Sequence, residues 1–426
     1  MDNFIEFLYS KFLQSDGVSI DTRSIGQDNL FFALKGPNFN GNKYAPQALE
    51  KGAAFAVVDE IEFVTDPRII LSPISCLDAL QQLAIFHRSR FKRKVLAITG
   101  SNGKTTTKEI MARVLAEKYI VHATKGNLNN HLGVPLTILD IYPQVEIAII
   151  EMGANHVGEI AALCQIANPG YGLITNIGEA HTETFGGIEG VLRGKSELFD
   201  YLRKTGGTPF INTMDHRLEN MTKRFEEPIL FPENDLKLLE ANPYIIFELS
   251  GKRVETNLVG AYNFGNVSAA VAVGRAFAVD DDQICQAIAS YKPDNQRSEI
   301  IVKGSIVIIN DCYNANPTSM NAALDNLKLI SGKKTVILGD MKEVQDSEIK
   351  HRELGKRVKE MNPQQVIFIG SEMKNAQLEV PNSKWFDNVS DFLGVLDQFS
   401  FEANTVLIKG SRSGKLDLIE GKLGEL

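Results

Sequence analysis

Cysteines, basic residues and long apolar runs are scarce in this sequence, and each scarcity excludes a class of protein. The four cysteines are scattered and show no CxxC spacing, which argues against a disulfide framework and a zinc site. No apolar run is long enough to span a bilayer, and the N-terminus lacks the basic segment and apolar core of a signal peptide. These absences predict a cytoplasmic protein with reduced thiols and no stable membrane insertion.

The charge balance is acidic. The 426 residues carry a formal net charge of −8, which argues against a general nucleic-acid binder. It does not exclude small anionic substrates, because a local cluster of Lys, Arg and Mg²⁺ can override the global charge. The 43% hydrophobic and 23% charged content is typical of globular domains, and the length predicts two or three of them.

Apolar runs divide the chain into three blocks of the α/β class. Residues 1–85 mix short strands with turns and predict a small mixed N-terminal α/β domain. Residues 86–293 alternate strands with helices, which predicts a central parallel-sheet domain of the P-loop ATPase type, and the irregular stretch 205–258 adds a smaller sheet. Residues 294–426 repeat the alternation and predict a C-terminal Rossmann-like domain, with a hinge near Lys292-Pro293.

A glycine turn lies between the expected strand 95–99 and a helical pattern that starts near residue 105. Such a turn directs backbone N–H groups and a helix N-terminus at one point, which attracts phosphate. Lys104 would neutralise phosphate charge, and Thr105 would offer its hydroxyl to Mg²⁺. The spacing departs from GxxxxGK, because Ile98 stands where the first glycine is required. A turn before an ordinary helix is the alternative, but the strand–loop–helix context favours phosphate binding.

Polar residues follow other apolar strands of the second block. Glu151 ends one of them, and Asn176 and His181 come just after the next. The carboxyl ends of parallel strands are where such sheets bind ligands, so Glu151 and His181 are candidate metal ligands beside the phosphate loop. The pattern around Lys195 and Glu197 taken alone predicts only a solvated helix face.

Six segments of the sequence, taken together, resemble motifs of the Mur ligase superfamily of ATP-dependent amide-forming enzymes. They are TGSNGKT, EMGANHVGEI, TNIGEAH, GKSELF, YNFGN and NDCYNANPTSM. The resemblance covers nearly the whole chain. Three further features resemble the member that adds D-alanyl-D-alanine to UDP-N-acetylmuramoyl-tripeptide. They are DTRSI with LFFALKG, then KGNLNNHLGVPLTIL, and LGDMKE after DCYNANPTSM. The resemblance implies a monomeric ligase of cytoplasmic peptidoglycan precursor synthesis that uses ATP and Mg²⁺, forms an acyl phosphate, and holds the UDP-sugar in the first block.

The resemblance also implies roles for particular residues. It implies catalytic roles for Lys104, His181 and Lys195, with Lys195 carbamylated. The implied Mg²⁺ ligands are Thr105, Glu151, His181 and Lys195. The implied nucleotide-binding residues are Gly100, Ser101, Asn102, Gly103, Lys104, Thr105, Thr106, Asn263, Asn266, Arg297, Asp311 and Tyr313. The implied substrate-binding residues are Asp21, Thr22 and Arg23 near the uridine diphosphate, and Asn129 and Asn130 around the muramoyl peptide. The segment 409–412 resembles a loop that faces the incoming amine.

Departures from the family pattern concern the sugar-nucleotide end. The sequence has Asn40-Gly41-Asn42-Lys43 where Asp-Gly-His is usual, Thr22 where a serine is usual, and Gly187 where a serine is common. The main alternative is a related ligase that adds a single amino acid, but this sequence has NANPTS instead of Asp-Asn-Pro-Arg. A folate ligase would lack the first block. A regulatory protein that has lost ligation and a kinase are the remaining alternatives.

Overall fold

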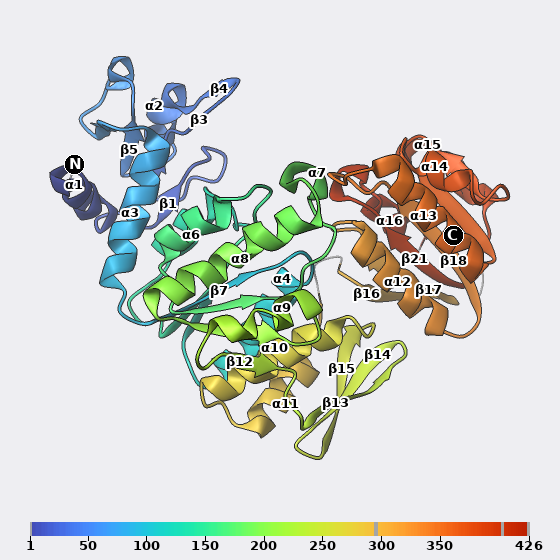
Figure 1. Ribbon diagram of the computed structural model, residues 1–426. Coiled ribbons are helices and arrows are strands. Elements are labelled where there is room, and N and C mark those ends of the chain that lie inside the picture. Colours follow the sequence, from blue (N-terminus) through green and yellow to red (C-terminus); the bar gives the residue numbers. More distant parts are fainter. Residues whose placement is uncertain (1, 294–296, 402–403, 424–426) are drawn as a thin grey trace.

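Three α/β domains follow one another along the chain in the computed structural model, which describes residues 2–293, 297–401 and 404–423 (Figure 1). The predicted three-domain α/β architecture is confirmed by the structure and by the solved structures that resemble it. Residue 294, where the third block is predicted to begin, lies outside the described residues. No helix in the described ranges is both long and apolar enough to cross a membrane.

The N-terminal domain is built on a short parallel sheet of order β1-β2-β5-β6. Its paired strands are β1 (Val18–Ser19), β2 (Leu30–Phe32), β5 (Phe55–Val58) and β6 (Ile69–Leu71). A small antiparallel hairpin joins β3 (Lys35–Gly36) and β4 (Phe39–Asn40). The helices are α1 (Asp2–Phe12), α2 (Ala45–Glu50) and α3 (Cys76–Arg90). The predicted boundary at residue 85 falls inside α3, so this helix belongs to both domains.

The contacts of α3 fix the first domain against the second. Arg88 is buried, and its Nε and Nη2 donate to Ala167 O and Asn168 O at 2.7 Å. Gln81 Nε2 donates to His131 O at 3.0 Å. One apolar core also runs without interruption from the first domain into one face of the central sheet. These contacts make the first two domains one packed unit.

The central domain has a six-stranded parallel sheet of order β12-β11-β10-β7-β9-β8. Its strands are β7 (Lys94–Thr99), β8 (Val121–Ala123), β9 (Ile147–Glu151), β10 (Tyr171–Ile174), β11 (Thr208–Asn212) and β12 (Ile229–Phe231). Its helices are α4 (Lys104–Ala116), α5 (Gly133–Leu139), α6 (Glu159–Ala167), α7 (Thr182–Phe185), α8 (Ile188–Thr205), α9 (His216–Glu219), α10 (Asn263–Ala276) and α11 (Asp281–Ser290). The smaller sheet expected in 205–258 is antiparallel and consists of β13 (Leu236–Ala241), β14 (Tyr244–Leu249) and β15 (Lys252–Val259).

Strand β7 shows why this sheet is central. Val95 and Ala97 belong to the core shared with the N-terminal domain, whereas Leu96 and Ile98 belong to the core under α4, α10 and α11. Successive side chains of a strand point to opposite faces, so an uninterrupted apolar run is what a strand covered on both faces requires. The polar residues of the site therefore lie after the strand, at its carboxyl end.

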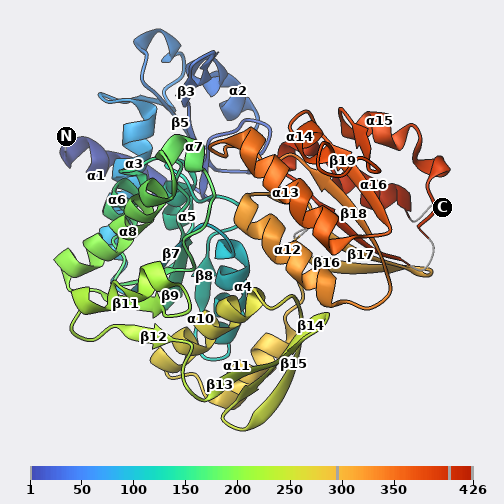
Figure 2. The same cartoon turned by 45° about the vertical axis from the view of Figure 1, so that its right-hand side comes forward.

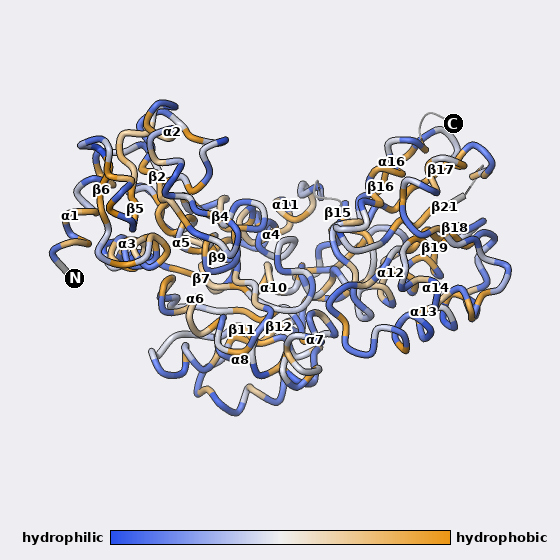
Figure 3. The backbone as a smooth tube through the Cα atoms, turned by 90° about the horizontal axis from the view of Figure 1, so that it is seen from above, coloured by the Kyte–Doolittle hydropathy of each residue, from blue (hydrophilic) through white to orange (hydrophobic). Residues whose placement is uncertain are grey.

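The C-terminal domain has a six-stranded sheet of order β16-β17-β21-β18-β19-β20, parallel except for β16. Its strands are β16 (Glu299–Lys303), β17 (Ile306–Asp311), β18 (Lys333–Gly339), β19 (Gln365–Ile369), β20 (Lys384–Phe386) and β21 (Asn404–Lys409). Its helices are α12 (Pro317–Leu329), α13 (Ser347–Met361), α14 (Met373–Gln377), α15 (Val389–Leu393) and α16 (Asp417–Leu423). Figure 2 shows α12 on the side of this domain that faces the central domain, and Figure 3 shows the domain lying beside the other two.

Candidate active site

The turn between β7 and α4 brings the backbone close to neighbouring groups. Gly100 has a φ of 144°, and a Cβ there would lie 1.9 Å from Thr175 Oγ1. Gly103 has a φ of 80°, and its Cβ would lie 2.5 Å from Asn266 Oδ1. Both positions therefore need glycine. The turn is also held by Asn176, whose Oδ1 accepts from Asn102 N at 3.1 Å.

Lys104 follows this turn, and its side chain folds back onto the turn. Its Nζ donates to Gly100 O at 2.7 Å and to Ser101 O at 3.3 Å. Burial lowers the pKa of Lys104 to about 8, although nearby Glu151 acts in the opposite direction. The ammonium is therefore stabilised by carbonyls of its own loop and is placed where a phosphate at the turn would meet it.

Glu151 at the end of β9 has a carboxylate oxygen that accepts no hydrogen bond. Its side chain is buried, and Oε1 accepts from Asn129 Nδ2 at 2.8 Å and from Thr105 Oγ1 at 3.3 Å. Its Oε2 is buried without a hydrogen-bond partner and lies 3.6 Å from Lys108 Nζ. A buried carboxylate oxygen without a donor, next to a hydroxyl, suits a hard cation such as Mg²⁺.

Lys195 on α8 is almost completely buried, at 1% exposure. The solvated helix face that its local sequence suggests is wrong at this position, because α8 packs Gly194, Lys195 and Ser196 inward. Its Nζ donates to Ala154 O at 2.9 Å and lies 5.1 Å from the centre of the Phe185 ring. Burial, with repulsion from Lys104, lowers the pKa of Lys195 to about 7. Much of this lysine is therefore a neutral amine at neutral pH.

His181 follows β10 and reaches the C-terminal domain. Its backbone is left-handed, with a φ of 56°, and its Nδ1 is hydrogen-bonded to Glu343. Burial lowers the pKa of His181, and Glu343 opposes this shift. Across the described ranges, no group of three or more His, Cys, Asp or Glu side chains is placed to hold a metal ion.

Asn263 and Asn266 lie in the first turn of α10 and fix it against α4. Asn266 Nδ2 donates to Asn263 Oδ1 at 2.6 Å, and Asn266 Oδ1 accepts from Thr107 Oγ1 at 2.9 Å. Asn263 Nδ2 donates to Val259 O at 2.8 Å. Both asparagines are buried beside the phosphate loop, so α10 closes one side of the site.

The C-terminal domain contributes cations and an aromatic ring. The guanidinium carbon of Arg297 lies 3.7 Å from the centre of the Tyr313 ring, with Arg412 at 5.7 Å from the same ring. Asp311 at the end of β17 accepts from Lys409 Nζ at 2.6 Å. A planar ring with positive charges nearby, together with a carboxylate, can contact a nucleotide base and its ribose.

One cleft of about 970 Å³ connects these groups. It runs from the phosphate loop and the C-terminal domain to Gln81 and Ile85 on α3. The predicted site residues in its lining are Ser101, Asn102, Gly103, Lys104, Thr105, Thr106, Asn129, Asn130, Glu151, His181, Lys195, Asn263, Asn266, Arg297, Asp311 and Tyr313. Gly100 does not line the cleft, because it lies against Thr175.

Comparison with known sequences identifies the family. Family models match residues 14–88 (Mur ligase family, catalytic domain), 98–274 (Mur ligase middle domain) and 296–412 (Mur ligase, glutamate ligase domain). The UDP-N-acetylmuramoyl-tripeptide–D-alanyl-D-alanine ligase of Bacillus subtilis (strain 168) is 34% identical over 433 residues, covering 96% of this chain and 94% of that protein. The chain belongs to the Mur ligase family. The resemblance seen in the sequence motifs is confirmed.

Solved structures resemble this Mur ligase over nearly its whole length. Crystal structure I of MurF from Acinetobacter baumannii has a TM-score of 0.87 and 29% identity, covering 96% of this chain and 93% of that one. MurF ligase from Thermotoga maritima in complex with ADP has a TM-score of 0.84 and 28% identity, covering 97% and 98%. The similarity to these two structures therefore extends over all three domains.

In this Mur ligase, Asp21, Thr22 and Arg23 are outside the lining of the cleft. They form a turn after β1 in which Arg23 Nη2 donates to Asp21 Oδ2 at 2.6 Å, and this pairing lowers the pKa of Asp21 to about 2. Lys51 Nζ donates to Thr22 O at 2.8 Å. The structure does not bring these three residues to the phosphate loop.

The unusual Asn40 and Asn42 form a buried polar network of this Mur ligase. Asn42 is fully buried, and its Nδ2 donates to Asn40 Oδ1 and to Asp59 Oδ1, both at 2.9 Å. Lys35 Nζ lies 2.9 Å from Asp59. Asn42 therefore anchors the segment after the β3–β4 hairpin to Asp59.

Three residues that contact the Mur ligase site were not predicted from the sequence. Glu343 pairs with His181, and Asn316 Nδ2 donates to Asn102 Oδ1 at 2.7 Å across the domain boundary. Lys108, the buried neighbour of Glu151, was also missed. Lys108 lies one helical turn after Lys104. Glu343 ends LGDMKE and Asn316 lies in DCYNANPTSM, so both stand in quoted motifs, but their contacts with His181 and Asn102 follow only from the fold.

Proposed function

We propose that this Mur ligase joins D-alanyl-D-alanine to UDP-N-acetylmuramoyl-tripeptide, with ATP converted to ADP and phosphate, in cytoplasmic peptidoglycan precursor synthesis. The observation that carries the proposal is the single cleft that connects the phosphate loop, Glu151 and buried Lys195 with Arg297 and Asp311 of another domain. The names of the Bacillus subtilis relative and of the two MurF structures support the same reaction. We expect a monomer that acts without nucleic acid.

A free carboxylate is a poor acyl donor, because its leaving group would be oxide. Transfer of the γ-phosphoryl group of ATP to the tripeptide carboxylate gives an acyl phosphate, from which phosphate can leave. The amine of D-alanyl-D-alanine then attacks, and a peptide bond forms as phosphate departs and the amine loses a proton. Lys104 stabilises the phosphoryl oxygens during the first step, because its ammonium lies against the turn and lines the cleft.

The residues present fit Mg²⁺, which the family resemblance implies. Glu151 Oε2 lacks a donor, and Thr105 lies beside the same carboxylate. Glu151, Thr105, His181 and carbamylated Lys195 would hold the ion, which would screen the repulsion between the carboxylate and the triphosphate. The neutral amine of Lys195 can add to CO₂ and lose one proton, which places an anion at this position.

The other polar residues of the cleft have binding roles in this proposal. The nucleotide lies among residues 100–106, Asn263, Asn266, Arg297, Asp311 and Tyr313. Asn129 and Asn130 contact the muramoyl peptide, and the turn of residues 21–23 holds its uridine diphosphate end. Contact between Arg297, Asp311 and the nucleotide keeps the C-terminal domain closed, which excludes water from the acyl phosphate.

A coupled phosphate-release assay tests the proposal. With ATP and Mg²⁺, we expect phosphate only when UDP-N-acetylmuramoyl-tripeptide and D-alanyl-D-alanine are both present, and mass spectrometry should show the joined product. Single amino acids offered in place of the dipeptide test the alternative ligase. Phosphate release with one of them, and none with the dipeptide, would refute the proposal. Transfer of phosphate to a hydroxyl would identify a kinase.

A further inference from the structure

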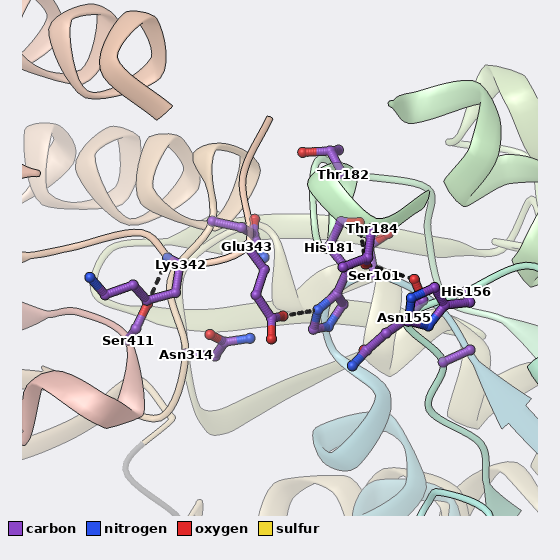
Figure 4. A network of polar contacts seen from close by, with 12 residues as sticks. Ser101, Asn155, His156, His181, Thr182, Thr184, Asn314, Lys342, Glu343 and Ser411 are labelled. Atoms are coloured by element: carbon purple, nitrogen blue, oxygen red, sulfur yellow. Dashed lines mark hydrogen bonds and ion pairs between the residues drawn. The ribbon is translucent and has the colours of Figure 1, made fainter. Parts of the chain in front are cut away.

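One hydrogen bond joins His181 of the central domain to Glu343 of the C-terminal domain (Figure 4). Both residues have left-handed backbones, with φ angles of 56° and 58°. Such a conformation is unfavourable for a residue with a side chain, whereas glycine adopts it freely. Two side-chain-bearing residues in this conformation, meeting across a domain boundary, point to a role for the side chains themselves.

The two loops around this pair dock along several contacts. Gln345 N donates to Thr182 Oγ1 at 3.0 Å, and Glu183 N donates to Glu343 O at 3.4 Å. The residues that follow His181 and Glu343 in the two loops therefore contact one another as well. Formation of that bond accompanies docking of the two domains.

The loop that carries Glu343 is anchored inside its own domain. Met341 N donates to His351 Nε2 at 3.1 Å, and His351 is completely buried. Lys342 N donates to Ser411 Oγ at 3.1 Å, as Figure 4 shows. Two residues directly before Glu343 are thus fixed to the body of the domain, so its carboxylate is delivered to His181 from a defined direction.

The chemistry of this bond assigns the proton on the imidazole ring. An ionised carboxylate is only an acceptor, so Nδ1 of His181 must be the donor. In a neutral imidazole the other nitrogen, Nε2, then carries the lone pair. Nε2 makes no hydrogen bond to any residue within the described ranges, and the His181 side chain lines the cleft whereas Glu343 does not. The available lone pair therefore belongs to the residue that lines the cleft.

We propose that Glu343 is a positioning residue, supplied by the C-terminal domain, that holds the proton of His181 on Nδ1 and so makes Nε2 a ligand atom when the domains close. The proposal rests on the proposed function. Histidines that bind metals commonly donate their second ring N–H to a carboxylate, and that partner orients the ring and raises its basicity. Here the partner comes from another domain, so the metal site would be complete only in the closed molecule.

A second ion pair across the same boundary provides a matched control. Lys350 Nζ lies 3.1 Å from Glu179 Oε1, and this pair joins the same two domains without touching His181. Loss of Lys350 weakens closure alone, whereas loss of Glu343 weakens closure and removes the acceptor for Nδ1–H. The comparison of Glu343→Ala with Lys350→Ala therefore separates positioning from docking.

The first experiment reads the ring directly by NMR in the full-length protein without metal, with and without ADP. ¹⁵N-labelled histidines report which ring nitrogen is protonated, and His181→Asn identifies the signal among the seven histidines. We expect the Nδ1–H form in the wild type, in Lys350→Ala and in Glu343→Gln, whose amide oxygen still accepts. In Glu343→Ala the Nδ1–H fraction should fall by about half or more. An unchanged tautomer in Glu343→Ala, or no Nδ1–H form in the wild type, would overturn the proposal.

The second experiment measures the Mg²⁺ concentration that gives half-maximal phosphate release. Loss of such a partner typically costs 10–100-fold in metal affinity, so Glu343→Ala should raise this concentration by about tenfold or more. Lys350→Ala should change it by less than about threefold, and an equal change in both variants would show that Glu343 only aids docking. If the wild type released no phosphate, the proposed function would fail, while the NMR experiment would still test Glu343.

Discussion

Burial changes the chemistry of one lysine in this molecule. On the surface, Lys195 would be a permanent cation, but within the described residues its Nζ has one carbonyl acceptor, Ala154 O, and an aromatic ring nearby. The cost of charging an amine in that environment lowers its pKa to about 7. The side chain can therefore exist as the nucleophile that carbamate formation requires, next to a second lysine, Lys104, which disfavours its charge.

The pH dependence of CO₂ uptake tests this behaviour at the scale of the residue. Because the pKa of Lys195 is lowered to about 7, the neutral fraction rises about tenfold between pH 6 and pH 8. The rate at which CO₂-depleted protein recovers activity, at constant dissolved CO₂, should rise by the same factor of about ten. A lysine with an ordinary pKa would give a rise of about a hundredfold over this interval.

The variant Lys195→Ala is the control for that measurement. It should remain inactive when CO₂ is returned, and a small carboxylic acid should partly restore it by supplying the missing anion. Recovery of the wild type that does not depend on CO₂, or a fully active alanine variant, would contradict the carbamate role.

Local pattern accounts for some site residues and not for others. Glu151 ends strand β9, and Lys104 and Thr105 begin helix α4 after the turn that follows β7, so their positions follow from the order of strand, loop and helix. The burial of Lys195 could not be predicted from GKSELF, because it depends on Phe185 and on the packing of α8. Glu343 is 162 positions from His181, so only the folded chain brings the pair together.

At the scale of elements, the strands were the best predicted features. The apolar runs VLAIT (95–99), EIAIIEM (146–152) and SIVIIND (305–311) contain the strands β7, β9 and β17, and both faces of their sheets are covered. The extent of α3 was not predicted, because the local sequence does not show that this helix packs on two domains. Docking of α12 at the phosphate loop likewise depends on tertiary structure.

The N-terminus of α12 (Pro317–Leu329) combines a cap with an interdomain contact. Asn316 Oδ1 accepts from Ser319 N at 2.9 Å, while its Nδ2 donates to Asn102 of the phosphate loop. Asn316→Ala should lower the free energy of unfolding by about 1 kcal/mol through loss of the cap. It should also raise the KM for ATP about fivefold, because one interdomain hydrogen bond of about 1 kcal/mol is lost.

Asn388→Ala is the matched control for Asn316→Ala. Asn388 caps α15 (Val389–Leu393) by accepting from Asp391 N at 3.1 Å, and its side chain hydrogen-bonds Asp391 of the same domain rather than the phosphate loop. Urea denaturation should show a similar loss of stability, while the KM for ATP stays within about twofold. An equal rise of KM in both variants would mean that the cap, and not the contact with Asn102, is responsible.

At the scale of the whole molecule, the first two domains have apolar cores separate from those of the third domain, which closes over them. Among the described residues, the buried cores of the first and second domains end at Tyr291, and the buried cores of the third domain begin at Ile308, with Ile300 and Ile301 packed against them. A protein of residues 1–295 should therefore fold, with helical circular dichroism and a cooperative melting transition. It should bind ATP weakly and show no ligation, because Arg297, Asp311 and Lys409 are absent.

Isothermal titration with ATP and the coupled phosphate assay check that prediction, with the full chain as the control. Full ligase activity of residues 1–295 would contradict both the role of the C-terminal domain and the proposed closure. A fragment that fails to melt cooperatively would contradict the independence of the cores.

The continuity of α3 (Cys76–Arg90) affects which UDP-sugar peptide can serve as the acyl donor. Fifteen residues of helix, about 22 Å long, connect the first domain rigidly to the second. If the uridine end of the donor is held by the first domain, its distance to the phosphate loop is constant while the third domain moves. One amino acid more or less changes the reach of the donor by about 3.5 Å, which would take its terminal carboxylate away from Lys104. The fixed distance between the first two domains would then select the length of the peptide, independently of any pocket for its side chains.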